Sequence, residues 1–332
     1  MRARTASSRG QIIVIMALAL PGLLGAMALC IDVWNLYSNW THLQIAADAG
    51  VLAGATYLRP NDASTEATAD PVARTYAQHN GVQNGEITSV TFAPDQTWIR
   101  MTVTRPVPFY FGRVLGLTTT PVSVAARASI QGATGTGPGG LAPIGIQCPA
   151  PCTSPPYSPG TPISLIQKNP KAIGEVWAPG NWGALNLNIP LGSHGGGVPL
   201  FASNIVNGYQ GTVIIGNEVP TDTGFGKSSV NPQVRDAINT LINEGIGLFP
   251  DDTPSIFDPT NPRIITVPLV DFTGVTGTSN PVIVEGFASI WLTSASADGT
   301  IEGVFITTTA NAVLPGGGGT PCVTACAPVL TE

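Results

Sequence analysis

The sequence has few charged residues and few histidines, and these shortages exclude several classes of protein. Charged side chains make up 10% of the 332 residues, against roughly 25% in ordinary soluble domains. The net charge is −6, and the chain has no basic cluster beyond its N-terminus. We therefore do not expect nucleic-acid binding, which requires a cationic stripe. With three histidines in all, a histidine-based metal or catalytic centre is not expected either.

The common catalytic motifs are also missing, because neither G-x-S-x-G nor H-E-x-x-H occurs. Residues 226–228 read G-K-S like the end of a phosphate loop, but the first glycine of that motif would fall on Thr221. We interpret His194 and the aspartate pair at 251–252 as loop residues, with a catalytic imidazole and a weak calcium site as the alternatives. The sequence thus predicts a protein that is not an enzyme and has no cofactor or metal.

One long apolar run is present, and it begins close to the N-terminus. It extends from Ile12 to Ile31 without a charge. A bilayer core of about 30 Å needs roughly 20 apolar residues at 1.5 Å each, so this run is long enough to span it. Arg2, Arg4 and Arg9 precede the run. The positive-inside bias then predicts a cytoplasmic N-terminus, with the rest of the chain in the periplasm or outside the cell.

A cleaved signal peptide is the alternative interpretation of this run. The sequence Ala26-Met27-Ala28 offers a small-x-small cleavage site. The run is longer than a signal core of about 7–15 residues, which favours a retained anchor. Pro21 and Gly25 lie inside it. We interpret them as a tolerated kink, with close helix packing through small residues as the alternative.

The five cysteines fall into two groups. Cys30 lies in the apolar run and is expected to be a small buried side chain. The other four form two C-x-x-x-C pairs, Cys148 with Cys152 and Cys322 with Cys326. Outside the cytoplasm an even set of cysteines predicts disulfides. Two local loops are favoured; the alternatives are bridges between the two pairs and, least favoured, a metal site.

A helix is predicted from Asp32 to about Leu58, since apolar residues recur there near a 3.6-residue period. After Leu43 most of its surface is alanine and glycine, so another element can approach closely, either a helix of a partner subunit or the chain's own sheet. The candidates for a helix–helix interface are Gln44, Ala47, Asp48, Gly50 and Gly54.

Asp48 is the least ordinary of these candidates because it is an acid among alanines. Gln44 lies one turn earlier on the same face and is placed to share its contacts. The alternative for Asp48 is a solvated helix face or a bond to neighbouring backbone.

The remaining chain predicts an α+β fold. A single transmembrane helix continues into a long helix packed on a small antiparallel sheet, and a second, mainly-β domain follows. The predicted units are a basic segment at 1–11, the span at 12–31, a helix with a small α+β domain at 32–131, a Gly-rich linker at 132–140, a mainly-β domain at 141–314 and a loose Gly/Cys tail at 315–332.

Helices outside the first are predicted at 71–79, capped by Asp70, and at 232–244, capped by Asn231 and ended by Gly245. An aromatic turn or short helix is predicted at 109–115. Strands are predicted at 87–92, 98–105, 122–130, 162–166, 184–189, 211–215, 264–270, 281–293 and 301–308.

The N-terminal pattern resembles a known family. It consists of Arg9-Gly10-Gln11 before the apolar run, Asp32-Val33 after it, and the Leu-Gln and alanine-rich sequence of 43–55. This pattern resembles the N-terminal domain of TadG-like Flp pilus-assembly proteins. The Phe-Tyr-Phe-Gly-Arg sequence at 109–113 is similar to minor pilins of the TadE/TadG type. The resemblance is specific over about residues 9–58 and looser to residue 131.

The resemblance implies a membrane-anchored structural component of the Tad pilus system, minor-pilin-like and without enzymatic activity. It implies a single pass through the inner membrane, with lipid and other Tad/Flp subunits as partners through the N-terminal helix. Two features depart from the family. Ile15 stands where prepilin processing uses a glutamate, and the D-x-S-x-S metal motif of many TadG proteins is missing.

An anchored or secreted carbohydrate-binding or hydrolytic β-domain is the alternative function. Its binding platforms would be Trp177, Trp182 and Trp291. Large aromatic residues are more often part of a core, and we favour that interpretation for these three.

Overall fold

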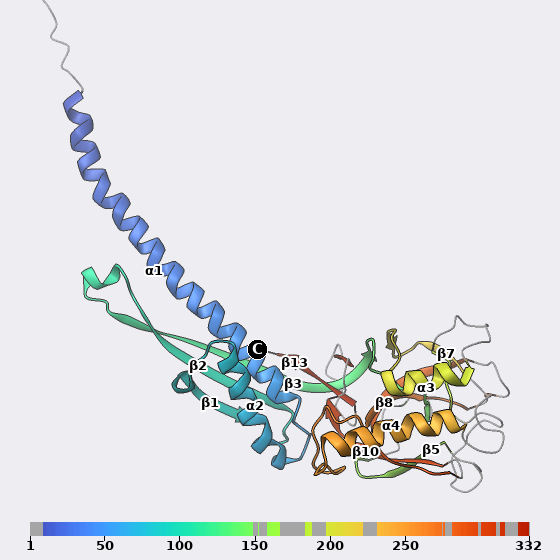
Figure 1. Cartoon of the computed structure of the whole chain (residues 1–332). Helices are drawn as coiled ribbons and strands as arrows, with labels where there is room; N and C mark the ends of the chain where they lie inside the picture. Colours follow the sequence, from blue (N-terminus) through green and yellow to red (C-terminus); the bar gives the residue numbers. More distant parts are fainter. Residues whose placement is uncertain are drawn as a thin grey trace, which may run out of the picture.

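The computed structural model describes residues 9–148, 152, 158–166, 183–187, 197–221, 231–273, 275, 281–297, 300–309, 313–315 and 325–331. One long helix leads into a seven-stranded sheet, and a six-stranded sheet with two helices on it follows (Figure 1). The predicted α+β class, with a long N-terminal helix, an antiparallel sheet and a mainly-β second region, is confirmed. The domain boundaries stay a prediction.

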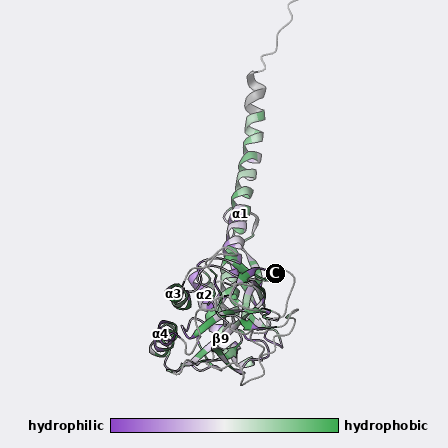
Figure 2. Cartoon of the chain, turned by 90° about the vertical axis from the view of Figure 1, so that its right-hand side faces the viewer, coloured by the Kyte–Doolittle hydropathy of each residue, from purple (hydrophilic) through white to green (hydrophobic). Residues whose placement is uncertain are grey.

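Helix α1, Arg9–Ala55, contains both the apolar run and the helix predicted after it. It has 47 residues and continues through Pro21 without a break. A proline in a span is tolerated because neighbouring groups and local adjustments satisfy the freed carbonyl. Within the described residues, α1 is the one helix long and apolar enough to cross a membrane. Its first half projects from the body as an apolar rod (Figure 2).

The second half of α1 packs on helix α2, Glu66–His79, and on the first sheet. Small side chains make this packing close. A Cβ added at Gly54 would lie 2.9 Å from Cβ of Ala73 and 3.0 Å from the backbone oxygen of Ala69. The buried core between these elements comprises Leu43, Ala46, Ala47, Val51, Ala55, Leu58, Ala69, Ala73, Ala77, Ile99, Met101, Val103, Val124, Ala126, Ala128 and Ile130, with Val82 and Ile87 beside them.

Helix α2 begins five residues earlier than predicted, so the predicted start at residue 71 is wrong. Thr65 holds the N-cap position and Pro71 lies inside the helix. Asp70, the predicted cap, instead pairs with Arg74 at 2.8 Å. The extra first turn forms because its residue Ala69 is buried against α1, and such packing outweighs the local cost of the proline.

The first sheet has the strand order β1-β2-β3-β13-β11, and β6 and β12 also pair with β3. Its longest ladder is the β2–β3 hairpin, which pairs from Trp98↔Ser129 to Pro108↔Thr119. The strands are β1 Ile87–Phe92, β2 Trp98–Pro108, β3 Thr119–Thr136, β6 Val213–Ile214, β11 Thr308–Thr309, β12 Val313–Pro315 and β13 Ala325–Leu330. Short 3₁₀ helices are η1 Ala63–Thr65, η2 Asn84–Glu86 and η3 Gly112–Leu115.

Two predictions for this region are wrong. Residues 132–136 of the predicted linker continue β3, and residues 325–330 of the predicted loose tail form β13. Strand β13 runs antiparallel to β3 from Cys326↔Gly132 to Leu330↔Ala128. The glycines of β3 are held in the sheet because β13, β12 and β6 occupy their backbone hydrogen bonds.

The second sheet has the order β4-β8-β9-β10-β5, and β7 pairs with β9. Helices α3 and α4 pack together over one face (Figure 1). The elements are β4 Ile146–Gln147, β5 Pro162–Ile166, β7 Glu218–Pro220, β8 Ile264–Val270, β9 Pro281–Ala295, β10 Ile301–Ile306, α3 Gly197–Asn207 and α4 Pro232–Leu248. Of the strand predicted at 184–189, the described residues form two isolated bridges at Ala184 and Leu185.

Helix α4 confirms its predicted cap but not its predicted end. The side chain of Asn231 accepts the N–H of Gln233 at 2.9 Å. The helix then runs past Gly245 to Leu248. Gly245 is needed for close approach rather than termination, because an added Cβ there would overlap the side chain of Asn261. Helix α3 was not predicted.

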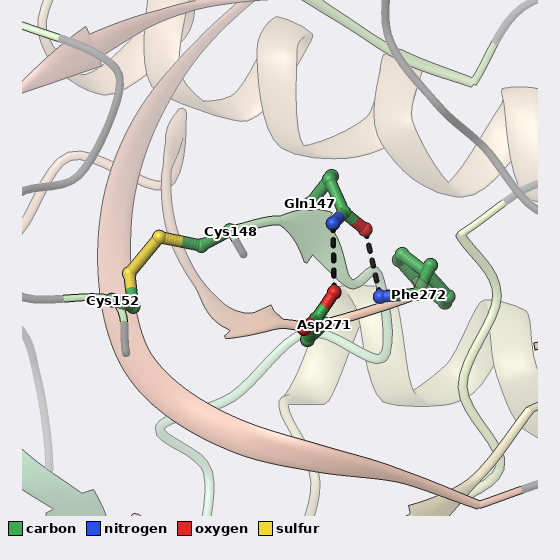
Figure 3. Close-up of a disulfide and its surroundings, with 5 residues drawn as sticks. All are labelled: Gln147, Cys148, Cys152, Asp271 and Phe272. Atoms are coloured by element: carbon green, nitrogen blue, oxygen red, sulfur yellow. Dashed lines mark hydrogen bonds between the residues drawn. A yellow bond between two sulfur atoms is a disulfide. The ribbon is translucent and has the colours of Figure 1, made fainter. Parts of the chain in front are cut away.

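The disulfide between Cys148 and Cys152 closes the local loop favoured from the sequence, with a Cα–Cα distance of 5.6 Å. Next to it, Gln147 ties β4 to the end of β8 (Figure 3). Its Nε2 donates to Oδ1 of Asp271 at 3.0 Å, and its Oε1 accepts the N–H of Phe272 at 2.7 Å. Cys326 is disulfide-bonded too, while the prediction for Cys322 lies outside the described residues.

A chain of ring and cation contacts joins the segment that follows α1 to the second sheet. Nη1 of Arg59 donates to the carbonyl of Ser255 at 2.6 Å, and its guanidinium lies 4.8 Å from the ring centroid of Phe257. Phe257 in turn contacts the ring of Trp291 at 5.7 Å. The guanidinium of Arg263 lies 4.5 Å from the Trp291 ring. This joint, together with the contacts of β3 and β13 with β9, connects the two sheets.

Candidate functional site

The feature with the most specific geometry is a buried carboxylate at the end of the apolar run. Asp32 is 5% exposed. It accepts the backbone N–H of Tyr110 at 2.7 Å, of Phe111 at 3.1 Å and of Gly112 at 2.7 Å. A buried carboxylate is costly unless such donors surround it. These bonds attach the tip of the β2–β3 hairpin to α1, and we call them the Asp32 latch.

Further polar contacts follow the latch along α1, towards its C-terminal end. Nδ2 of Asn35 donates to the carbonyl of Pro108 at 3.0 Å. Arg105 on β2 reaches Oδ1 of Asn39 at 3.3 Å. Positions 32, 35 and 39 lie on one helix face by their i, i+3, i+7 spacing. Residues 32–39 of α1 are therefore joined to the hairpin by polar bonds, whereas α1 from Leu43 onwards is joined to the rest of the protein by apolar packing.

Arg105 is also paired with an acid. Its Nε lies 2.6 Å from Oε1 of Glu86, and its Nη2 donates to the carbonyl of Gly81 at 2.8 Å. The hydrogen bond from Arg105 lowers the pKa of Glu86 below its usual 4.5; burial opposes this, and the N–H of Gln83 adds to it. The pair thus joins η2 and the end of α2 to the hairpin.

The low pKa of Glu86 predicts a pH dependence of stability. Since the folded pKa lies below the unfolded value of 4.5, the stabilisation is present above pH 4.5 and is lost as the pH falls through the folded pKa. In Glu86→Gln the free energy of unfolding is expected to fall less steeply over that acid range than in the unchanged protein. Denaturant titrations at a series of pH values measure this. Glu244→Gln, at an exposed position of α4, is the control and should keep the original slope; equal slopes in all three proteins would contradict the prediction.

The hairpin tip and the nearby turns of α1 have large exposed apolar side chains. The exposed residues at the tip are Tyr110, Phe111, Val114 and Leu117, and those on other faces of α1 near this height are Val33, Trp34, Tyr37 and Trp40. Val114 is 88% exposed. Gly116 ends η3 with φ 85°, a left-handed conformation that lets the chain turn back into β3. The tip is thus a short apolar loop fixed at a defined height on α1.

The predicted interface residues of α1 divide into two groups. Ala47, Gly50 and Gly54 are buried against α2 and β2, so the chain's own fold, one of the two alternatives, occupies that face. Gln44 and Asp48 lie at the edge of the buried face and are half-buried. Nε2 of Gln44 donates to Oδ1 of Asp48 at 2.8 Å and to the carbonyl of Ala125 at 3.1 Å.

The residues of the predicted span lie on the projecting half of α1. Pro21, Gly25 and Ile31 are exposed there, and the helix includes Ile12. Cys30 is exposed as well, contrary to the predicted burial, because α1 has already left the body of the protein at this point. An added Cβ at Gly25 would meet nothing within 4 Å, so its small size serves no contact within the chain.

The remaining candidates do not form a site in the described residues. Trp291 is fully buried, which confirms the core interpretation and removes it as a binding platform. Oδ2 of Asp252 accepts the N–H of Asp258 at 2.8 Å and so organises its own loop. Among the residues that the structure describes, no three metal-ligating His, Cys, Asp or Glu side chains come together. Trp177, Trp182, His194 and residues 226–228 lie outside the described residues.

Sequence reasoning used Asp32 as the end of the apolar run and, with Val33, as part of the family pattern, but it missed the bonds of Asp32 to residues 110–112. A signal was present. An acid directly after a span needs hydrogen-bond donors, and the turn at 109–113 supplies free N–H groups at the start of a 3₁₀ helix. The sequence separation of about eighty residues hid the pairing.

The comparisons agree with the N-terminal geometry. The Tad family model, Flp pilus-assembly TadE/G-like, matches residues 10–56. The matched residues are almost the same as those of α1, Arg9–Ala55. The chain therefore begins with a TadE/G-like segment, which supports a role related to Flp pili. No curated protein and no solved structure matches the chain.

Proposed function

We propose that this protein is a membrane-anchored, non-enzymatic structural subunit of Flp/Tad pilus assembly, similar in role to a minor pilin. One observation carries the proposal. The TadE/G-like match falls on a single helix whose first half is an exposed apolar rod and whose second half is part of the core. A helix of this kind fixes a folded body to a bilayer without a flexible joint.

The proposed topology has the N-terminus in the cytoplasm and the body in the periplasm or outside the cell. The arginines before the span support this direction. The disulfide between Cys148 and Cys152 supports it too, because disulfides persist in oxidising compartments. Spheroplasts treated with protease should lose the body while the membrane retains a short N-terminal fragment. A body protected from protease in intact spheroplasts, or a chain released from membranes by alkaline carbonate, would contradict the proposal.

The outward face of α1 is the surface we propose for contact with other Tad subunits. Trp34 and Tyr37 are 68% and 65% exposed, and Ile45, two turns further, is 56% exposed. Asp48 follows on the same face by its i+3 spacing. In this topology lipid covers the residues of α1 before Asp32, so the residues of α1 after Asp32 are available to a protein.

Asp48→Leu tests this contact. The fold is expected to remain intact because Gln44 keeps its bond to the carbonyl of Ala125. Co-purification with other Tad subunits is expected to weaken, since the variant removes the one acid of this face. Circular dichroism and pull-down from solubilised membranes measure the two effects. The matched control is Asp236→Leu on α4, where the side chain is 66% exposed; co-purification equal to that of the control would contradict the contact.

A further inference from the structure

The Asp32 latch fixes where the hairpin tip lies relative to a bilayer. Asp32 directly follows Ile31, the last residue of the apolar run. One helical residue is a rise of about 1.5 Å, and the headgroup layer on each side of a bilayer is roughly 5–7 Å thick. Backbone atoms of residues 110–112 lie within hydrogen-bonding distance of Asp32. The tip therefore lies at the height of the headgroup layer.

The side chains of the tip have the chemistry of that layer. Phe111, Val114 and Leu117 are 45%, 88% and 52% exposed, and Tyr110 is 62% exposed. Arg113 between them is exposed as well. Aromatic residues are enriched at membrane interfaces, and an arginine at this depth reaches lipid phosphates. In water the same loop would expose several neighbouring apolar side chains without compensation.

We propose that the hairpin tip, residues 109–117, is a second membrane contact, inserted into the headgroup layer of a phospholipid bilayer next to α1. Val114 and Leu117 face the boundary of the acyl chains, and Arg113 binds lipid phosphate. Asp32 is a positioning residue because it holds the tip at this depth. The proposal rests on the membrane anchor of the proposed function.

The consequence of a second contact is orientation. A single helix fixes the distance of the body from the membrane but leaves its tilt and rotation open. A tip that projects sideways from α1 (Figure 1) adds a second point of attachment. The folded body is then held at one angle to the bilayer, and the same side of the first sheet always faces the membrane.

A fluorescence experiment on the full chain in vesicles tests the proposal. Cys30→Ala removes the free cysteine of the described residues, and Val114→Cys then carries an environment-sensitive label. The purified protein is reconstituted in phosphatidylcholine–phosphatidylglycerol vesicles with no other Tad subunit present. We expect a blue-shifted emission and strong quenching by lipids that carry a nitroxide near the headgroup. Leu248→Cys on α4, 62% exposed, is the control, with unshifted emission and no quenching.

A second variant tests the latch in the same experiment. Asp32→Ala in the Val114→Cys protein is expected to reduce quenching, because the tip is no longer held beside α1. Quenching unchanged by Asp32→Ala would show that Asp32 does not position the tip. If that variant does not fold, Asn35→Ala, which removes the bond to Pro108, replaces it.

The outcomes separate this inference from the proposed function. A Val114 label as unquenched as the Leu248 label, in a chain that resists alkaline carbonate, overturns the inference and leaves the anchor in place. A chain that carbonate releases overturns both. A label that is solvent-exposed in vesicles but crosslinks to another subunit in cells would make the tip a protein-binding surface, and the inference would again be wrong.

Discussion

Gly50→Leu is expected to destabilise the protein by about 3 kcal/mol, the upper end of the usual cost of overpacking a core. A Cβ added at Gly50 would lie 2.8 Å from the backbone oxygen of Ala73 and 3.2 Å from Cβ of Ala77. A backbone oxygen in a helix cannot move aside alone, so α2 as a whole must shift away from α1. The midpoint of chemical denaturation in detergent, followed by tryptophan fluorescence, measures the loss.

The matched control for Gly50→Leu is Gly247→Leu. Gly247 is also inside a helix, α4, but an added Cβ there meets nothing within 4 Å. Replacing a glycine at an exposed position inside a helix should stabilise the protein by up to about 1 kcal/mol. Opposite signs for the two variants are therefore expected. A Gly50→Leu protein as stable as the original would show that the α1–α2 contact is looser than the structure has it.

Deletion of residues 325–332 is expected to destabilise the first sheet. Ala325, Cys326 and Ala327 are buried, and β13 pairs with β3 over five register positions. At about 0.8 kcal/mol for each buried methylene-sized group and about 1 kcal/mol for each net hydrogen bond, the loss is at least about 3 kcal/mol. Limited proteolysis should then cut within β3, and thermal unfolding should begin at lower temperature.

The deletion also removes a disulfide-bonded cysteine, so its control must separate the strand from the bridge. Cys326→Ala removes the bridge and keeps the strand with a side chain that fits the same space. It should retain protection of β3 from protease. If Cys326→Ala and the deletion are equally sensitive, the bridge rather than the strand pairing stabilises the sheet.

The elements that could be predicted from the sequence are those whose structure is determined by neighbouring residues in the chain. The 3.6-residue period and the missing proline predicted the helix that ends near Ala55. Alternation predicted β1 to the residue, and short apolar runs predicted β5 and β8 to the residue. The cap at Asn231 was predicted for the same reason, since a cap and its first turn are sequence neighbours.

The elements that could not be predicted depend on partners far away in the chain. Residues 132–136 look like a linker because they are glycine- and threonine-rich, and they become strand because β13, β12 and β6 bind them. Likewise, the alanines and glycines of α1 predicted a close contact but left open whether a partner's helix or the chain's own sheet makes it; α2 and β2 do. The Asp32 latch is the clearest case, because its carboxylate and its three donors lie about eighty residues apart in the chain.

The continuity of α1 has a mechanical consequence. Forty-seven residues at a rise of about 1.5 Å give a helix roughly 70 Å long. In the proposed topology its first part lies in lipid, and its second part belongs to the core of the protein. Since no loop interrupts this helix, a force applied to its N-terminal end is transmitted along it to the first sheet, on which it packs. A filament that grows against this helix would load the folded body directly, and the polar bonds at Asp32, Asn35 and Asn39 would be the first to carry shear.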